Sequence, residues 1–185
     1  MNDEVGKLRT VVLGIAFDFG GAPDIEECYD PKSIESIRLG IFPLEKDLIR
    51  EMNAFLNVFQ RYGVRVYRPQ NIPGLNQIYA RDIAFVIGNK LIIPNVIKER
   101  SEELSALNDL LESIDESHIL KMPKDARAEG GDVILNGDSI FIGYSENEDF
   151  DAYKVARTNL AGVEFIEKSF PDKKIRAFEL LKSDT

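Results

Sequence analysis

Short apolar runs separated by turn residues recur along the chain, and one longer segment shows helical spacing. The run Leu8–Ile15 is largely apolar and rich in β-branched residues, and it predicts a first strand. From Pro43 onward apolar residues recur every three or four positions as far as Phe59. This spacing predicts a helix that starts near Pro43 and is capped by Gly63. A strand over 64–67 follows directly.

Two hairpins are predicted further along the chain. The first joins the runs 83–87 and 91–93 through Gly88-Asn89, and the second joins 133–135 and 140–142 through a turn that contains Asn-Gly. After the first hairpin, apolar spacing predicts a helix between residues 104 and 114 and a strand over 118–120. After the second, it predicts a helix over about 148–161, a cap at Gly162 and a strand over 163–166. Asp82 and Asp132 each precede the first strand of a hairpin.

The repeated order of strand, strand, helix and strand predicts an α/β fold. Such a module cannot bury both faces alone, so several copies are expected to pack around a common centre with their helices outside. We expect one domain over 1–185, with modules at roughly 4–68, 78–121 and 128–167. The apolar segment that starts at Ile175 is interpreted as the first strand of a further module. That open edge predicts that the 185 residues are a fragment of a longer protein.

Composition narrows the class of protein and of ligand. No apolar run approaches the ~18 residues that cross a bilayer, and the N-terminus is acidic, so no membrane association is expected and the predicted location is cytoplasmic. Cys28 is the only cysteine, which fits a reducing compartment. Asp and Glu total 32 against 23 Lys and Arg, a net charge of −9. This balance argues against a nucleic-acid partner and favours a cationic ligand.

The candidate chemistry centres on Glu129-Gly130-Gly131-Asp132, where two acids flank a glycine pair at the entry of a hairpin. Together with Asp82, these acids suit a guanidinium group, which is planar, permanently charged and bound bidentately by carboxylates. Alternatives remain at this point. The motif is also compatible with a glycine-rich turn whose acids face solvent, and Asp82 with a pair to Arg81 or another cation. A metal site is disfavoured because the spacing matches no calcium loop.

Three stretches resemble the guanidino-group modifying enzymes, which include arginine deiminase, dimethylarginine dimethylaminohydrolase and glycine amidinotransferase. They are Glu129–Asp132, the opening Val5–Gly14, and Ala80–Pro94 with Glu99-Arg100-Ser101 after it. The third is most similar to the amidinotransferase branch. The resemblance covers the whole chain and implies about three modules of a five-module, pentein-type α/β propeller. We expect no cofactor and no metal.

The resemblance also implies a mechanism and residue roles. In that family a cysteine thiolate attacks the guanidinium carbon, a histidine protonates the leaving amine, and water or an acceptor amine resolves the adduct. Glu129 matches the acid that orients the catalytic histidine, and Asp82 a carboxylate that grips the guanidinium. Asn76 matches a substrate-pocket asparagine. Asp132 matches the second acid of the motif, assigned to substrate binding or to a structural role.

The family's histidine and cysteine lie toward the C-terminus, beyond residue 185. His118 is expected to be a packed or surface histidine, and Cys28 lies in an N-terminal loop. We therefore expect an active parent enzyme, a hydrolase or amidinotransferase acting on arginine or a related guanidino compound, and an inactive 185-residue chain. The alternatives are a non-enzymatic binding protein on the same scaffold and a regulatory half-protein completed by a partner. Oligomeric state, including a homo-oligomer, is open.

Overall fold

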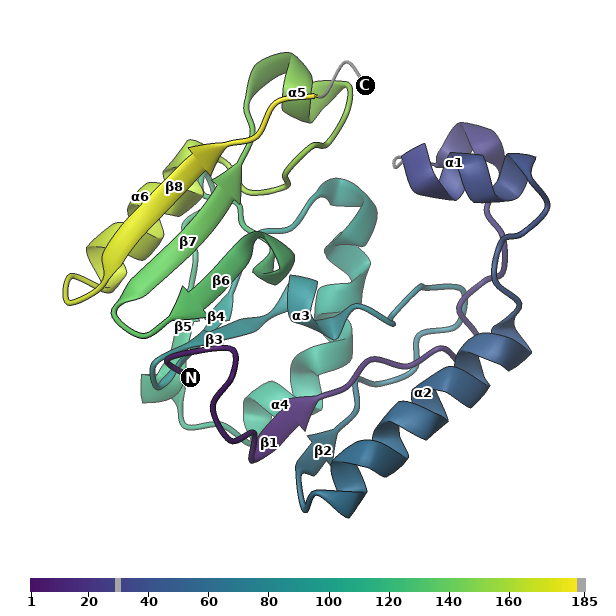
Figure 1. Cartoon of the computed structure of the whole chain (residues 1–185), viewed down its shortest axis with the longest axis horizontal. Helices are drawn as coiled ribbons and strands as arrows, with labels where there is room; N and C mark the ends of the chain where they lie inside the picture. The colour runs from purple at the N-terminus through teal and green to yellow at the C-terminus, as the bar shows by residue number, and fades with distance from the viewer. Residues whose placement is uncertain (29–30, 183–185) are drawn as a thin grey trace. The chain divides into compact units, whose positions relative to one another are not determined.

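The computed structural model describes residues 1–28 and 31–182. The chain divides into two compact units, where the sequence pattern predicts one domain. Unit 1 comprises Met1–Gly6, Arg81–Ser101 and Ile114–Thr185, and unit 2 comprises Lys7–Ala80 and Glu102–Ser113. Each unit has its own secondary structure, coloured along the chain in Figure 1.

Unit 2 contains a two-stranded parallel sheet and one long helix. Strand β1 (Thr10–Val12) pairs in parallel with β2 (Arg65–Tyr67), and α2 (Glu45–Arg61) connects them. Gly63 has φ of +67°, the left-handed conformation expected of a residue that follows a helix end, so the predicted cap is confirmed. The unit also holds η1 (Ile25–Glu27), α1 (Pro31–Arg38) and α4 (Asn108–Glu112).

Unit 1 contains two three-stranded sheets with the same order and polarity. In each, an antiparallel hairpin is followed by a strand parallel to its second member. The first sheet consists of β3 (Phe85–Ile87), β4 (Lys90–Ile93) and β5 (Ile119–Lys121). The second consists of β6 (Val133–Asn136), β7 (Ser139–Tyr144) and β8 (Lys174–Glu179). Both predicted hairpins are confirmed.

The same turn closes both hairpins. Gly88 and Gly137 each occupy the first position of a two-residue loop, with φ of +59° and +58°. A positive φ at the first loop position alone, without one at Asn89 or Asp138, belongs to a type II′ turn, which glycine adopts at no steric cost and whose twist suits a hairpin. The two glycines therefore give the two sheets a common register.

The prediction for the last forty residues is wrong in two places. The predicted strand 163–166 is part of helix α6 (Leu160–Ser169), and Gly162 lies inside that helix rather than capping the one before it. A Cβ at Gly162 would overlap the carbonyl oxygen of Arg127, so glycine serves a close approach there. The segment from Ile175 does not open a further module. It forms β8, the parallel partner of β7 that completes the second sheet.

Other predicted elements differ in kind or extent. The predicted helix over 148–161 is only the short α5 (Asn147–Asp151). The predicted helix over 104–114 consists of the 3-10 helix η2 (Lys98–Leu107) followed by α4. Asp82 lies in a helical turn, α3 (Ala80–Ile83), which precedes β3. His118 ends the 3-10 turn η3 (Glu116–His118) before β5.

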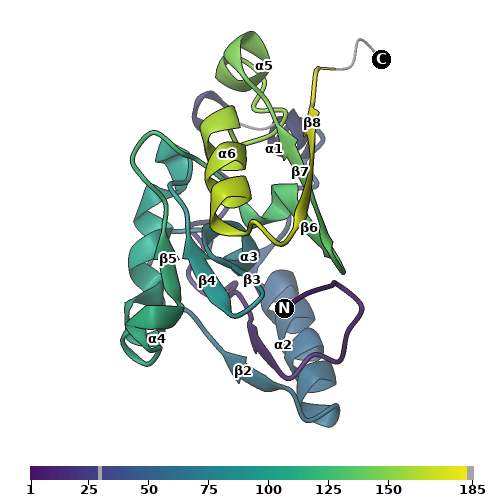
Figure 2. The ribbon, with the colours of Figure 1, turned by 90° about the vertical axis from the view of Figure 1, so that its left-hand side faces the viewer.

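One hydrophobic core joins the two sheets of unit 1. Figure 2 shows α6 on one face of the β6–β7–β8 sheet, between it and the β3–β4–β5 sheet. The buried side chains of this core come from both sheets, from the segment after β5 and from α6: Phe85, Ile87, Ile92, Met122, Ala126, Ala128, Val133, Leu135, Ile140, Ile142, Val163 and Ile166. Among the residues that the structure describes, no helix is both long and apolar enough to cross a membrane.

Candidate functional site

The glycine pair of the Glu129–Asp132 motif allows two short turns to pack together. Residues Gly130–Asp132 form a 3-10 turn, η4, directly before β6, in the same place that α3 takes before β3. A Cβ at Gly130 would overlap the carbonyl oxygen of Arg81, and one at Gly131 would lie 2.8 Å from Asp82 Oδ1. Without side chains at these positions, η4 lies against α3. This packing brings the carboxylates that flank the two turns into one site.

Arg81 fixes that packing. Its Nε donates to Gly130 O (2.8 Å) and its Nη2 donates to Val133 O (2.7 Å). The other side of its guanidinium forms a bidentate pair with Glu4, with Nη1 and Nη2 at 3.0 and 2.9 Å from the carboxylate oxygens. This pair lowers the pKa of Glu4 and raises the pKa of Arg81. Arg81 is therefore a structural clamp, and its acid partner is Glu4 rather than Asp82.

Asp82 and Glu129 both face the guanidinium of Arg100. Arg100 Nη1 donates to Asp82 Oδ2 at 2.6 Å and lies 3.6 Å from Glu129 Oε2. Arg100 is only 3% exposed, so the contact with Asp82 is a charge-assisted bond in a largely water-excluded place. The cation that pairs with Asp82 is thus Arg100. Two carboxylates of unit 1 therefore converge on one guanidinium, that of Arg100.

Glu129 is a buried acid with one paired and one unpaired oxygen. It is 3% exposed, and its Oε2 accepts from Arg157 Nη1 at 3.0 Å. Its Oε1 has no hydrogen-bond partner among the residues that the structure describes. Burial raises the pKa of the Glu129 carboxyl, and the positive charges of Arg157 and Arg100 oppose that rise. An unsatisfied buried carboxylate oxygen is costly to the fold and marks a place where a donor is expected.

Asp132 organises the loop that carries Arg157. Its Oδ2 accepts from the backbone N–H of Arg157, the backbone N–H of Thr158 and the Thr158 hydroxyl, each at 2.9 Å. Thr158 Oγ1 in turn accepts from the Glu129 backbone N–H at 3.3 Å. Burial raises the pKa of Asp132, against the effect of the bonds from Thr158 and Arg157. These contacts favour the structural role for Asp132 over contact with a substrate.

The contacts described for the remaining candidates are with other groups, not with these carboxylates. Asn76 belongs to unit 2, is exposed, and accepts from its own neighbour Ile78 N at 3.3 Å. His118 is exposed, with Nδ1 3.0 Å from Asn89 O. Cys28 Sγ lies 3.5 Å from Asp24 O in unit 2. The contacts of His118 show a surface position, as expected for it.

Sequence reasoning missed the two arginines. Arg100 was part of the stretch Glu99-Arg100-Ser101 but was given no role, and Arg157 lies in a loop without any apolar pattern. A pairing argument points toward cations of this kind, because buried acids require them. Their side chains contribute positive charge beside Glu129 and so keep a buried carboxylate ionisable.

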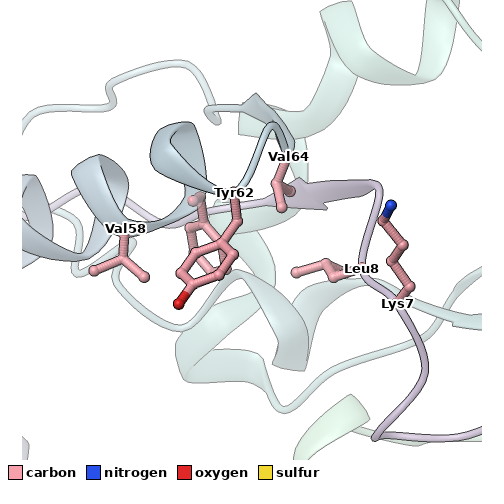
Figure 3. A pocket seen from close by; sticks show the side chains of 6 residues that line it. Lys7, Leu8, Val58, Tyr62 and Val64 are labelled. Atoms are coloured by element: carbon pink, nitrogen blue, oxygen red, sulfur yellow. The ribbon is translucent and has the colours of Figure 1, made fainter.

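An apolar surface feature of unit 2 contrasts with this charged site. A hollow of about 320 Å³ on unit 2 is lined by Lys7, Leu8, Val58, Phe59, Tyr62 and Val64. Figure 3 shows the Tyr62 ring lying between Val58 and Leu8, so the lining is apolar and offers no carboxylate to a cation. Within the described ranges 1–28 and 31–182, no group of three or more His, Cys, Asp or Glu side chains is placed to hold a metal ion.

The fold is the α/β fold of guanidino-modifying enzymes. A dimethylarginine dimethylaminohydrolase from Pseudomonas aeruginosa, solved as a variant with citrulline, matches with a TM-score of 0.69 and 15% identity over 96% of this chain. An amidinotransferase of saxitoxin biosynthesis from Microseira wollei matches with a TM-score of 0.67 and 20% identity over 97%. An inosamine-phosphate amidinotransferase from Streptomyces griseus matches with a TM-score of 0.67 and 16% identity over 100%. At these identities the likeness is one of fold.

The chain is shorter than the proteins that it matches. It covers 62–64% of the three structures. By sequence, it is 34% identical over 77 residues to YkgA, an uncharacterized protein of Bacillus subtilis (strain 168); the match spans 41% of this chain and 26% of that protein. No family model matches the sequence.

Proposed function

We propose that these residues are the acid-bearing part of a guanidino-modifying enzyme, a hydrolase or amidinotransferase that acts on a C–N bond of arginine or a related guanidino compound. The observation that carries the proposal is the unpartnered, buried Oε1 of Glu129, which shares its carboxylate with the Oε2 that is paired with Arg157. An acid placed in this way is suited to accept a hydrogen bond from an imidazole N–H and to stabilise the imidazolium.

Asp82 is the proposed guanidinium acceptor. Its carboxylate lies beside Gly131 and is 19% exposed, so it is reachable by a ligand while part of it remains held by Arg100. A planar substrate cation presents N–H donors of the kind that Arg100 Nη1 presents to Asp82. The solved relatives support the ligand class, since one was determined with citrulline bound. Asn76 remains a predicted pocket residue.

The proposed reaction is nucleophilic substitution at the guanidinium carbon. A cysteine thiolate forms an S–C bond, the C–N bond to the leaving amine breaks, and a histidine held by Glu129 gives that amine its proton. Water or an acceptor amine then attacks the amidino adduct and releases the thiolate. The thiol and the imidazole are assigned to chain outside residues 1–185, because the resemblance places both toward the C-terminus of the family's proteins and His118 is a surface residue.

The test requires the protein made from its whole reading frame. We expect release of an amine or ammonia from at least one of arginine, methylarginines and agmatine, with Glu129→Gln lowering kcat by ~10²-fold or more, as for loss of a general acid–base group. Asp82→Asn is expected to weaken substrate binding. Glu167→Gln, an exposed acid on α6, is the matched control and should leave both parameters unchanged.

Two results would contradict this assignment. Binding of guanidino compounds without turnover, under conditions where the histidine and cysteine are present, would favour the non-enzymatic binding protein. Equal activity of the Glu129→Gln and Glu167→Gln variants would remove Glu129 from the reaction even if the enzyme class is right.

A further inference from the structure

The backbone of Arg157 is held by two charged side chains of unit 1. Its N–H donates to Asp132 Oδ2 at 2.9 Å, and its carbonyl oxygen accepts from Arg127 Nε at 2.8 Å. Both side chains come from the segment 127–132, whereas Arg157 lies in the loop between α5 and α6. Because the two bonds hold the peptide groups on either side of the Arg157 Cα, they set the direction in which its side chain leaves the loop.

Arg127 is itself fixed at its backbone and at its guanidinium. Its N–H donates to Asn159 Oδ1 at 2.9 Å, and its carbonyl oxygen accepts from the N–H of Asn159, the N-cap residue of α6, at 3.1 Å. Its Cζ lies over the Phe150 ring, 3.6 Å from the centroid, which is a cation–π contact. Arg127 therefore presents Nε to the Arg157 carbonyl from a side chain that is held at both ends.

The ring that contacts Arg127 belongs to α5, and the backbone around this helix is unusual. Asn147 and Lys154, on either side of Phe150, both have φ of +51°. For lysine this left-handed conformation is uncommon, and it persists only where the surrounding contacts compensate its cost. One such contact is visible, since Lys154 Nζ lies over the Phe150 ring at 4.7 Å from the centroid. The segment before Arg157 is thus folded so that Phe150 meets Arg127.

We propose that Arg127 is a positioning residue for the ion pair between Glu129 and Arg157. By holding the Arg157 carbonyl, it directs the Arg157 guanidinium to Glu129 Oε2, 3.0 Å away, and so fixes the carboxylate whose Oε1 is left for a further donor. Arg127 acts through Arg157, because its own described contacts are with Arg157, Asn159 and the Phe150 ring. The inference rests on the proposed function, in which Glu129 orients a histidine.

The exposure of the two partners explains why this support matters. The Arg157 side chain is 23% exposed, so it can turn toward solvent once its carbonyl is released. The Glu129 side chain is only 4% exposed and has no such freedom. Loss of the Arg127 bond is therefore expected to leave a buried carboxylate with a misplaced partner, which loosens the orientation of that carboxylate as well as its compensation.

Three substitutions separate positioning from a purely structural role. Arg127→Met keeps an unbranched apolar stem against Phe150 but has no donor for the Arg157 carbonyl. Arg127→Lys restores one donor and a cation over the ring, so it is the rescue variant. Ser145→Ala is the matched control, because it removes the buried bond from Ser145 Oγ to Ala156 O (2.6 Å), which fastens the same loop one residue before Arg157.

The first measurement is the ¹⁵N NMR signal of the Arg157 guanidinium, in the protein made from its whole reading frame. A guanidinium held by a carboxylate rotates slowly and gives separate Nη–H resonances, whereas a released one gives an averaged signal. We expect separate resonances in the unmodified protein, Arg127→Lys and Ser145→Ala, and an averaged signal in Arg127→Met. Arg157→Lys assigns the resonances, because they disappear in that variant. This readout requires no turnover.

The second measurement is steady-state kinetics on the same proteins with a guanidino substrate. Arg127→Met should lower kcat by ~10-fold, and Arg127→Lys should return it to within ~3-fold of the unmodified value, as expected for a misplaced and a restored group. Ser145→Ala should lower the urea midpoint of unfolding without lowering kcat.

Two results would overturn the inference. One is an unchanged Arg157 signal in Arg127→Met. The other is an equal fall of kcat in Arg127→Met and Ser145→Ala, which would show that any loosening of the loop has the same effect. If the unmodified protein turns over no guanidino compound, the proposed function fails, and the NMR comparison still decides whether Arg127 holds Arg157 against Glu129.

Discussion

Gly130 lies directly against the backbone carbonyl of Arg81, with no room for a Cβ between them. This approach couples the turn before β6 to the turn before β3, so the two hairpins are joined at the point where their acids meet. The same contact is reinforced by the Arg81 side chain, which donates to Gly130 O at 2.8 Å. The stability of unit 1 and the geometry of its candidate site therefore depend on the same few atoms.

Replacing Gly130 by alanine should lower the free energy of unfolding by about 2–3 kcal/mol, because backbone on both sides must shift to relieve the overlap. Gly131→Ala is the matched comparison. Its new methyl group meets Asp82 Oδ1 at 2.8 Å, the end of a side chain that can rotate away. It should cost less stability but displace the Asp82 carboxylate. Urea denaturation of both variants measures the difference. Equal losses of unfolding free energy would contradict this prediction.

The Arg81–Glu4 pair should contribute modestly, since its side chains are 44% and 30% exposed. We expect a coupling free energy of about 0.5–1 kcal/mol in a double-mutant cycle with Arg81→Met and Glu4→Gln. Arg81→Met alone should cost more than Glu4→Gln alone, because it also leaves the carbonyls of Gly130 and Val133 without these donors. A larger loss of unfolding free energy for Glu4→Gln than for Arg81→Met would show that Arg81 stabilises the packing mainly through its pair with Glu4.

Asp132→Asn should destabilise the protein by about 1–3 kcal/mol, because an amide cannot accept with the same strength from the three donors on Arg157 and Thr158. In the protein made from its whole reading frame, the substitution should also lower activity. The reason is that Thr158 and Arg157, which Asp132 holds, bind the Glu129 backbone and side chain. Asp138→Asn, at an exposed hairpin turn, is the control. A loss of substrate affinity with unchanged stability would instead support the substrate-binding role.

The sequence pattern predicted the hairpins well because their signals are local: turn glycines, and apolar runs on either side of them. It failed between 148 and 181, where residues 163–166 are apolar enough to suit a buried strand or a buried helix equally. Tertiary packing decides that case, since Val163 and Ile166 both enter the core from α6. The acids were found because they flank a glycine pair. Arg100 and Arg157 were not, because their importance lies in long-range ion pairs that leave no local pattern.

Glu129 should make stability depend on pH with a definite sign. Its pKa is raised in the folded protein, so the folded state binds the proton more tightly than the unfolded state does. The free energy of unfolding therefore falls as the pH rises from about 4.5, the usual value for this side chain, through the folded pKa. Glu129→Gln removes this contribution, and its stability relative to the unmodified protein should increase with pH over that interval.

Urea denaturation of the two proteins across this pH range measures the effect. Asp132 shifts in the same direction and Glu4 in the opposite one, so the comparison of the variant with the unmodified protein, rather than either curve alone, isolates Glu129. A stability difference that is independent of pH would mean that the arginines fully compensate the burial of this carboxylate.

Residues 1–185 alone should not turn over guanidino compounds, although the carboxylate pair and its arginines are complete within unit 1. The chemistry requires a thiolate beside the guanidinium carbon. The one cysteine, Cys28, follows the short turn η1 in the N-terminal loop, where the resemblance places no nucleophile. The measurement is amine or ammonia release from arginine by a preparation whose intact mass matches 20.9 kDa. Cys28→Ser in the protein made from its whole reading frame is the companion variant, and its activity should be unchanged. Turnover by the 185-residue chain that disappears on Cys28→Ser would identify Cys28 as the nucleophile and overturn the assignment of the thiol to chain beyond Thr185.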